Sequence, residues 1–115
     1  MEFDANRPIY LQIADAICNS ILQGKLKEED RLPSVREYGA QIGVNPNTVA
    51  RTYDALTEQG IIYNKRGIGF FVCKKAAQTI RKVEKEKFLQ EELPKIAKKA
   101  RLLDIDLNDI IKLFA

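Results

Sequence analysis

The sequence of 115 residues contains no histidine and only two cysteines, Cys18 and Cys73. Histidine and grouped cysteines supply most protein ligands for zinc, and histidine is the most frequent general acid or base. Two cysteines are also too few for a disulfide scaffold, so both are predicted to be reduced residues of the hydrophobic core. No metal site and no cofactor are therefore expected, and most classes of enzyme are excluded.

Long apolar segments are also absent. No run approaches the length of about 20 residues that a membrane helix needs. The first residues, MEFDANRP, are acidic and polar, whereas a targeting leader is basic and then apolar. Hydrophobic residues make up 45% of the chain and charged residues 30%, values close to those of soluble globular proteins. We expect a cytoplasmic protein without a membrane partner, built as one small domain plus an appendage.

Charge of one sign is not concentrated in any way that identifies a partner. The formal net charge is +3. Residues 1–73 contain eight basic and nine acidic side chains, and residues 74–115 contain eleven and seven. A function in nucleic-acid binding therefore has to be argued from the positions of individual cations rather than from the total.

Residues 32–60 contain two helix starts separated by a short turn. Ser34, followed three residues later by Glu37, forms a capping-box pattern that predicts the start of one helix. Gly43 tolerates the left-handed backbone that ends it, and Asn45, followed by proline, supplies the cap of the next helix. Two short helices joined in this way are typical of the helix-turn-helix unit, whose second helix presents its first residues to the major groove.

The hydrophobic periodicity indicates how these helices form a core. Residues 8–24 begin with proline and end with glycine, as helices commonly do, and isoleucine recurs at every fourth position. Residues 25–33 are predicted to be a charged connection anchored by two leucines. In the third helix the outward face carries Asn47, Ala50, Arg51 and Asp54. The positions predicted to face inward are Ile9, Ile13, Ile17, Ile21, Leu26, Leu32, Val35, Ile42, Val44, Val49, Tyr53 and Leu56.

A β-hairpin is predicted directly after the third helix. The segment IIYNKRGIGFFV reads as two short strands, residues 61–64 and 69–73. A hairpin in this position is a wing. Its tip carries Lys65 and Arg66 beside Gly67, which suits contact with phosphate or entry into a minor groove. An ordinary hairpin with a polar turn is the alternative interpretation.

From residue 74 the composition changes to Lys, Glu, Ala and Leu without glycine, which favours helices. Pro94 interrupts or restarts the helix, and Asp106 is a candidate cap for a last helix. About 40 residues cannot form a separate core, so the apolar stripes of these helices must pack on something else. A second copy of the chain is the expected partner, and folding back on the first domain of the same chain is the alternative.

The expected fold is therefore mainly α-helical with a small β-hairpin. It comprises a winged helix-turn-helix DNA-binding domain at residues 1–73 and a helical dimerisation tail at residues 74–115.

These features together resemble the GntR family of bacterial transcription regulators. The resemblance covers nearly the whole chain through RPIYLQIADAI, LPSVRE, VNPNTVARTYDAL and RGIGFFV, and the short helical tail is most similar to the YtrA subfamily. Tyr38 and Gly39 stand where the family usually has a leucine-alanine pair, a departure expected to loosen the second helix without touching a DNA contact. The resemblance implies a dimeric regulator of the repressor type whose tail serves dimerisation.

The candidate DNA contacts follow from the predicted helix starts and the wing. Asparagine and arginine pair with adenine and guanine edges, and Arg51 is the best single candidate for base reading. Arg36 matches the arginine of the family's LPSxRE segment and is placed to bind phosphate or a base edge, while Ser34 and its helix start offer amides to phosphate. The full predicted set is Ser34, Arg36, Asn45, Asn47, Thr48, Arg51, Lys65, Arg66 and Gly67.

Three of these residues also have purely structural interpretations. Asn45 would act only as a helix cap, and Thr48 would only satisfy the first helical turn. Arg36 would form an ion pair with Glu37 or another acidic neighbour.

The predicted function is sequence-specific binding of double-stranded DNA by a homodimer that meets an inverted repeat, with half-sites about 10 base pairs apart or at a related spacing. The alternative is a protein-interaction module that reuses the winged fold without sequence-specific DNA binding. A small-molecule effector is compatible with a basic helical tail, although no ligand-specific motif is present. An enzyme is disfavoured because the sequence has neither a nucleophile motif nor a phosphate loop.

Overall fold

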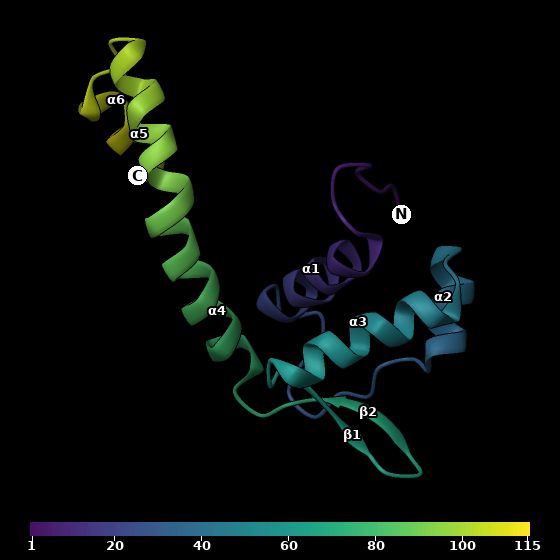
Figure 1. Ribbon diagram of the computed structural model, residues 1–115. Coiled ribbons are helices and arrows are strands. Elements are labelled where there is room, and N and C mark those ends of the chain that lie inside the picture. The colour runs from purple at the N-terminus through teal and green to yellow at the C-terminus, as the bar shows by residue number, and fades with distance from the viewer. The chain divides into compact units, whose positions relative to one another are not determined.

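Three helices and a hairpin make up most of residues Met1–Arg81, the first of two units in the chain (Figure 1). The computed structural model describes every residue from 1 to 115. Helix-turn-helix followed directly by a hairpin confirms the predicted mainly α-helical fold with a wing. The elements are α1 (Ile9–Leu22), α2 (Val35–Ile42), α3 (Pro46–Glu58), β1 (Ile62–Lys65) and β2 (Gly69–Val72), and α4 (Ala76–Lys87) begins in this unit.

The second unit, Lys82–Ala115, contains only helices, with a short turn at residues 103–106. The end of α4 continues through a π-helical turn, η1 (Phe88–Glu92), into α5 (Leu93–Leu102). Pro94 lies in the first turn of α5, directly after this π-helical turn, so the proline is accommodated by a local change of helix type and the helix is neither broken nor restarted. The chain ends with α6 (Leu107–Ile111) and the 3-10 turn η2 (Lys112–Phe114). The side chain of Asp106 accepts from the amide of Asn108 and caps α6, as predicted. No helix is both long and apolar enough to span a membrane.

The isoleucine stripe of α1 forms one wall of the core, with one exception. Ile13, Ile17 and Ile21 are buried, but Ile9 is 43% exposed. A step of four residues turns about 40° beyond a full revolution of a helix with 3.6 residues per turn, so a stripe of four such residues drifts around the axis. The end residue, Ile9, is therefore carried out of the core, and its predicted inward position is wrong.

The inward face of α3 fills the centre of the core, as predicted. Val49, Tyr53 and Leu56 are fully buried. The Tyr53 hydroxyl donates to the carbonyl oxygen of Pro33 at 2.7 Å, so its one polar atom is paired. Burial raises the pKa of this phenol well above its usual value. Of the other predicted anchors, Leu32 is buried, and those that pack against the core while half-buried are Leu26, Val35, Ile42 and Val44.

The packing of the first unit extends beyond the hairpin. Ala76 and Ile80 of α4 are buried in the same core as α1 and α3. The predicted boundary at residue 73 falls before these positions, whereas the packing units divide after Arg81, so a functional boundary at residue 73 stays a prediction.

Helix α2 is intact through the unusual Tyr38-Gly39 pair. A Cβ atom at Gly39 would stand 2.5 Å from the carbonyl oxygen of Val44, so the missing side chain lets the turn close against the helix. Gly43 then ends the helix with a φ of 71°, in the left-handed region. The glycine thus permits a close contact between the helix and the turn, and the expected loosening of the helix stays a prediction.

The hairpin lies within one residue of its predicted bounds and gains a neighbour that the sequence did not indicate. Residues 29–32 run beside β2: the amide of Leu32 donates to the carbonyl of Phe70 at 2.9 Å, and the amide of Val72 donates to the carbonyl of Asp30 at 2.9 Å. An isolated bridge joins Arg31 and Phe71. The predicted connection is therefore partly a third strand-like segment that supports the wing.

The two cysteines are not joined in a disulfide, and each is half-buried at the edge of the core. Burial raises the pKa of the Cys73 thiol, which keeps the thiol protonated and unreactive.

Candidate nucleic-acid interface

The start of α2 is held by a complete capping box. The amide of Glu37 donates to the Ser34 Oγ atom at 3.1 Å, and the amide of Ser34 donates to the Glu37 Oε1 atom at 3.1 Å. The hydrogen bond from the Ser34 amide is the main reason that the pKa of Glu37 lies below its usual value. This carboxylate is therefore committed to the helix start.

Arg36 is exposed on the first turn of α2 and has no acidic partner. The one ion pair in the structure joins Arg7 and Asp15, both on or beside α1. The alternative in which Arg36 pairs with Glu37 is therefore not found, and the guanidinium is free to contact an anion.

The start of α3 is capped by Asn45. Its Oδ1 atom accepts from the amide of Asn47 at 2.8 Å, while its own side-chain amide remains without a partner in the chain. Asn47 is exposed, whereas Thr48 is half-buried and its amide donates to the Asn45 carbonyl at 2.9 Å. Capping thus occupies only one side of the Asn45 amide group, and the two asparagines keep donors and acceptors that can face a ligand.

Arg51 lies one turn further along α3 and is exposed. Its guanidinium carbon lies over the ring of Tyr10, 4.1 Å from the ring centroid. The next residue, Thr52, is fully buried, and its hydroxyl is 2.9 Å from the Tyr10 carbonyl oxygen, to which it donates. Tyr10 was not among the predicted site residues, because it lies outside the isoleucine stripe and in another helix than Arg51.

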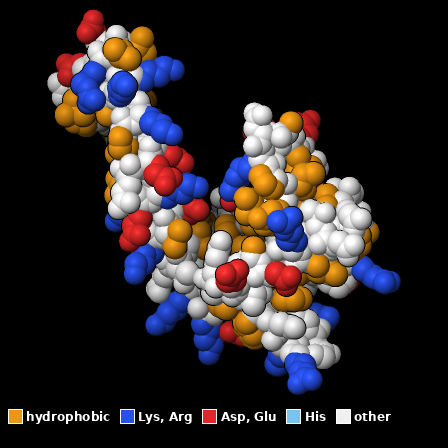
Figure 2. Space-filling model, viewed as in Figure 1, with side chains coloured by type: hydrophobic (Ala, Val, Ile, Leu, Met, Phe, Trp, Pro, Cys, Tyr) orange, Lys and Arg blue, Asp and Glu red, His pale blue; other side chains and the backbone are white.

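The wing tip carries the predicted cations on an ordered turn. Lys65, Arg66 and Gly67 are exposed, and the amide of Ile68 donates to the carbonyl of Lys65 at 2.9 Å. Gly67 has a φ of 79°, which fits the third position of a type II turn. Figure 2 shows basic side chains projecting at the hairpin tip, at the lower edge of the first unit.

Arg31 braces the wing and is a second residue that the sequence analysis missed. Its Nη2 atom donates to the carbonyl of Ile68 at 2.9 Å. A Cβ atom at Gly69 would lie 3.2 Å from the Arg31 Nε atom, so glycine provides room for this side chain. Arg31 also borders a polar hollow beside α2, lined by Arg31, Leu32, Pro33, Glu37 and Gln41.

The predicted contact residues come from adjoining parts of the first unit. Eight of the nine are exposed, the exception being the half-buried Thr48. In the view of Figure 1, the start of α3 and the tip of the hairpin lie on the same side of the unit. This arrangement offers a helix end with asparagine and arginine side chains and a loop with two cations.

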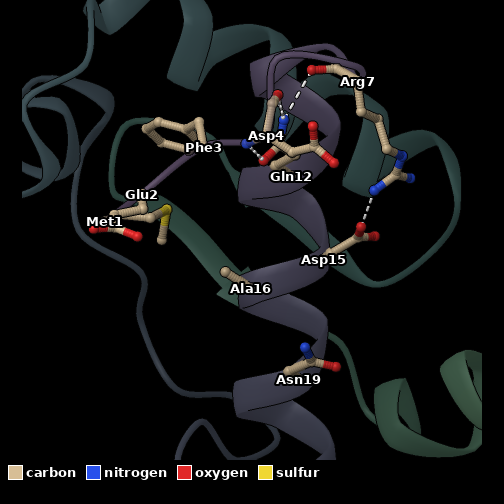
Figure 3. A pocket seen from close by; sticks show the side chains of 9 residues that line it. All are labelled: Met1, Glu2, Phe3, Asp4, Arg7, Gln12, Asp15, Ala16 and Asn19. Carbon is tan, nitrogen blue, oxygen red and sulfur yellow. Dashed lines mark hydrogen bonds and ion pairs between the residues drawn. The ribbon is translucent and has the colours of Figure 1, made fainter.

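A separate hollow lies between the first residues of the chain and α1 (Figure 3). The Gln12 side chain ties these residues down, because its Oε1 atom accepts from the Asp4 amide at 2.7 Å and its Nε2 atom donates to the Arg7 carbonyl at 2.8 Å. Arg7 also reaches Asp15 in the ion pair visible in Figure 3. The side chains of Gln12, Arg7 and Asp15 are thus used within the chain, and these contacts hold the segment that leads into α1. No group of three or more acidic, cysteine or histidine side chains could hold a metal ion.

Comparison with known proteins gives consistent matches. Residues 9–72 match the sequence profile of "Bacterial regulatory proteins, gntR family". The chain is 36% identical over 107 residues to the HTH-type transcriptional repressor YtrA of Bacillus subtilis, an alignment that covers 92% of this chain and 81% of YtrA.

Two solved structures extend these matches. A putative GntR-family transcriptional regulator from Bacteroides thetaiotaomicron has 49% sequence identity and a TM-score of 0.75, with 92% of each chain covered. The DNA-binding domain of AraR in complex with operator ORR3 has 33% identity and a TM-score of 0.56, and the match covers 64% of this chain and 86% of that one.

Proposed function

This chain belongs to the GntR family of bacterial regulatory proteins and is a transcription regulator, not an enzyme, and on that premise we propose that it is a repressor that binds an inverted-repeat operator as a homodimer. The observation that carries this proposal is the division of α3 into two faces. Val49 and Tyr53 close the core, while Asn47 and Arg51 are turned outward near the helix start. A helix end with this chemistry suits the edges of adenine and guanine in a major groove.

Base reading in this proposal belongs to α3, with Arg51 as the main contact and Asn45, Asn47 and Thr48 beside it. Arginine can donate two hydrogen bonds to the O6 and N7 atoms of guanine, and asparagine can pair with adenine. The exposed side chains of Asn47 and Arg51 support this assignment. The AraR domain, whose structure is similar to this chain, is in complex with an operator, which supports DNA binding by this chain.

Phosphate contacts in this proposal belong to the start of α2 and to the wing. Arg36 has no internal partner, and Ser34 lies at a helix start whose amides favour an anion. Lys65, Arg66 and the Gly67 backbone would follow the DNA backbone or the adjacent minor groove. Such contacts fix the register of the protein on the duplex, while the contacts of α3 select the sequence.

Dimerisation in this proposal belongs to the second unit. Twelve of the fifteen large apolar side chains that are exposed in the chain belong to this unit, and Ala100 is its one buried residue. Exposed apolar side chains in this number are expected to be buried against a partner surface. In a homodimer, the same apolar side chains of a second copy would pack against them. The exposed set is Val83, Phe88, Leu89, Leu93, Ile96, Leu102, Leu103, Ile105, Leu107, Ile111, Leu113 and Phe114.

Repression is proposed because the relative YtrA is named a repressor and its alignment with this chain covers 92% of this chain and 81% of YtrA. A dimer seated on an operator blocks access of other proteins to the same DNA. Two-fold symmetry of the dimer would be mirrored in an inverted repeat with half-sites about one helical turn, or a related spacing, apart.

The proposal is tested by selecting duplexes from a random-sequence pool with the wild-type chain and footprinting the best of them with hydroxyl radicals. We expect a protected region with two-fold symmetry and two equivalent half-sites. Enrichment of no sequence, or a single asymmetric half-site with one bound chain, would contradict the proposal.

The competing function is a protein-interaction module that uses the same face. A variant with alanine at Arg36, Arg51 and Arg66 distinguishes the two, because the winged core does not use these side chains. We expect this variant to lose repression of a reporter placed behind the selected duplex. Full repression by the triple variant would favour the interaction module.

A further inference from the structure

We propose that Tyr10 is a positioning residue for Arg51 and thereby contributes to the DNA sequence preference of this regulator. The inference rests on the proposed function, because it assigns to Tyr10 the task of ordering the main base-reading side chain before DNA arrives. Tyr10 belongs to α1, so the residue lies outside both the helix-turn-helix segment and the wing.

The geometry places an aromatic platform directly beneath the arginine. The Arg51 guanidinium carbon is 4.1 Å from the centroid of the Tyr10 ring, within the distance of about 6 Å that is typical of cation–π pairs. Arg51 is nevertheless exposed. Contact with the ring uses one side of the planar guanidinium, and N–H donors directed away from the ring remain available to a base edge.

The contact gives an advantage because a free arginine side chain samples many rotamers. The free energy gained from a base contact must then compensate for the entropy lost when these rotamers are restricted. A guanidinium that already rests on Tyr10 has lost part of this freedom before binding. Preorganisation of this kind favours the sequence that matches the held geometry and does little for non-specific contact with phosphate.

The platform is itself held in place by α3. The Thr52 hydroxyl donates to the Tyr10 carbonyl at 2.9 Å. Thr52 follows Arg51 in the sequence and is fully buried. Two consecutive residues of α3 thus contact Tyr10: Thr52 contacts its backbone carbonyl, and Arg51 contacts its ring. Upstream, the bond between Gln12 and the Arg7 carbonyl fixes the chain that enters α1 (Figure 3).

A different role for Tyr10 would be direct contact of its hydroxyl with phosphate. This hydroxyl makes no hydrogen bond within the chain, so a role of that kind is open to test. The two roles use different parts of the side chain: positioning needs the ring, and phosphate contact needs the hydroxyl. Phenylalanine and leucine substitutions therefore separate them.

The experiment measures dissociation constants for a duplex selected by the wild-type chain and for a scrambled duplex of the same composition. The variants are Tyr10→Phe and Tyr10→Leu, each with Arg51 and with Arg51→Ala. We expect Tyr10→Leu to reduce the ratio of the two constants about two- to fivefold, the effect of losing one exposed cation–π pair. Tyr10→Phe should keep the ratio, and in the Arg51→Ala background Tyr10→Leu should have no further effect.

Two results would overturn the inference: a loss of preference by Tyr10→Phe equal to that of Tyr10→Leu, or a loss by Tyr10→Leu that persists in the Arg51→Ala background. If Tyr10→Leu folds poorly, NMR of the DNA-free wild type and of Tyr10→Phe decides instead. The Arg51 side-chain protons should show a ring-current shift in both proteins, and its absence would contradict the contact.

Failure of the proposed function has a different signature. A wild-type chain that binds selected and scrambled duplexes equally would refute sequence-specific regulation as a whole. A wild-type preference that Arg51→Ala lowers and Tyr10→Leu leaves unchanged would refute only the role of Tyr10.

Discussion

At the scale of single residues, α3 shows how adjacent positions acquire opposite roles. Arg51 is exposed, while Thr52 and Tyr53 are fully buried. The 3.6-residue period predicts this alternation, since a rotation of about 100° per residue moves neighbouring side chains to different faces. The division between core residues and candidate base-reading residues could therefore be predicted from the sequence.

Partners that lie far away in the chain could not be predicted in the same way. Tyr10 meets Arg51 across 41 positions of sequence, and Arg31 reaches Ile68 across 37. No periodicity within a helix or strand encodes such pairs, because they depend on how α1, the connection and the wing are placed in three dimensions. These two residues were missed for that reason.

The buried hydroxyl of Tyr53 gives a prediction for stability. Tyr53→Phe removes the donor to the Pro33 carbonyl, a bond of 2.7 Å, and is expected to lower the free energy of unfolding by about 1 kcal/mol. Urea unfolding followed by circular dichroism measures this change. Tyr38→Phe is the matched control, since the half-buried Tyr38 packs edge-on against Tyr53 with no hydrogen bond from its hydroxyl, and it should be nearly neutral. Equal losses in both variants would contradict the assigned bond.

The brace of the wing gives a second prediction. Arg31→Ala removes the donor to the Ile68 carbonyl, and we expect the Ile68 amide at the wing tip to exchange with solvent about fivefold faster, corresponding to about 1 kcal/mol. Native-state hydrogen exchange by NMR measures the rate. The amide of Asn47, held by the side chain of Asn45, is the internal reference and should not change. An unaltered rate at Ile68 would show that the turn at the tip is ordered without Arg31.

At the scale of elements, the helix starts and ends were predicted most accurately because they are encoded locally. The capping box of Ser34, the left-handed Gly43 and the cap of Asn45 each lie within four residues of what they determine. The strand-like segment at residues 29–32 was missed because its charged composition is typical of a loop. Its hydrogen bonds to β2 are long-range pairings that a local pattern does not reveal.

The capping box predicts a dependence of stability on pH. The Ser34 amide lowers the pKa of Glu37 from its ordinary value of 4.5. A carboxyl group with a lowered pKa in the folded state stabilises that state above its unfolded pKa, and the contribution is lost as the pH falls through the folded value. The advantage of the wild type over Glu37→Gln should therefore be present at neutral pH and decrease as the pH falls below the ordinary value of 4.5.

Urea unfolding at a series of pH values measures this difference. Glu84→Gln, an exposed carboxylate of α4 without a hydrogen bond, serves as the control and should show no comparable dependence. A constant difference between wild type and Glu37→Gln at all pH values would show that the charge of Glu37 does not contribute to the cap.

At the scale of the whole molecule, the two units differ in how they are stabilised. The first has a core that includes α1, α3 and the hairpin, while the second exposes large apolar side chains along its helices. The helical composition of the tail and its apolar stripes could be predicted from the sequence. The π-helical turn at Phe88–Glu92 could not, because the pattern around Pro94 fits both an interrupted and a restarted helix.

The proposed dimer predicts a change of mass when a charge is placed on the apolar stripe. Ile96→Asp, at a position 50% exposed on α5, should convert the dimer to a monomer, because a carboxylate buried between two copies lacks a partner. Lys98→Asp, on a different face of the same helix, is the control and should leave the dimer intact. Light scattering at micromolar concentration measures the mass, and a monomeric wild type would instead support a tail that folds back on its own chain.

In the proposed complex, α3 and the wing contact one DNA duplex together, with α3 reading bases and the wing binding phosphate. A salt titration of fluorescence anisotropy, on selected and scrambled duplexes, tests it most directly with Arg51→Ala and Arg66→Ala. Arg51→Ala should cost about 1 to 3 kcal/mol on the selected duplex and much less on the scrambled one. Arg66→Ala should weaken both equally and lower the salt slope by about one. Equal losses on the two duplexes for Arg51→Ala, or unchanged binding for Arg66→Ala, would contradict the claim.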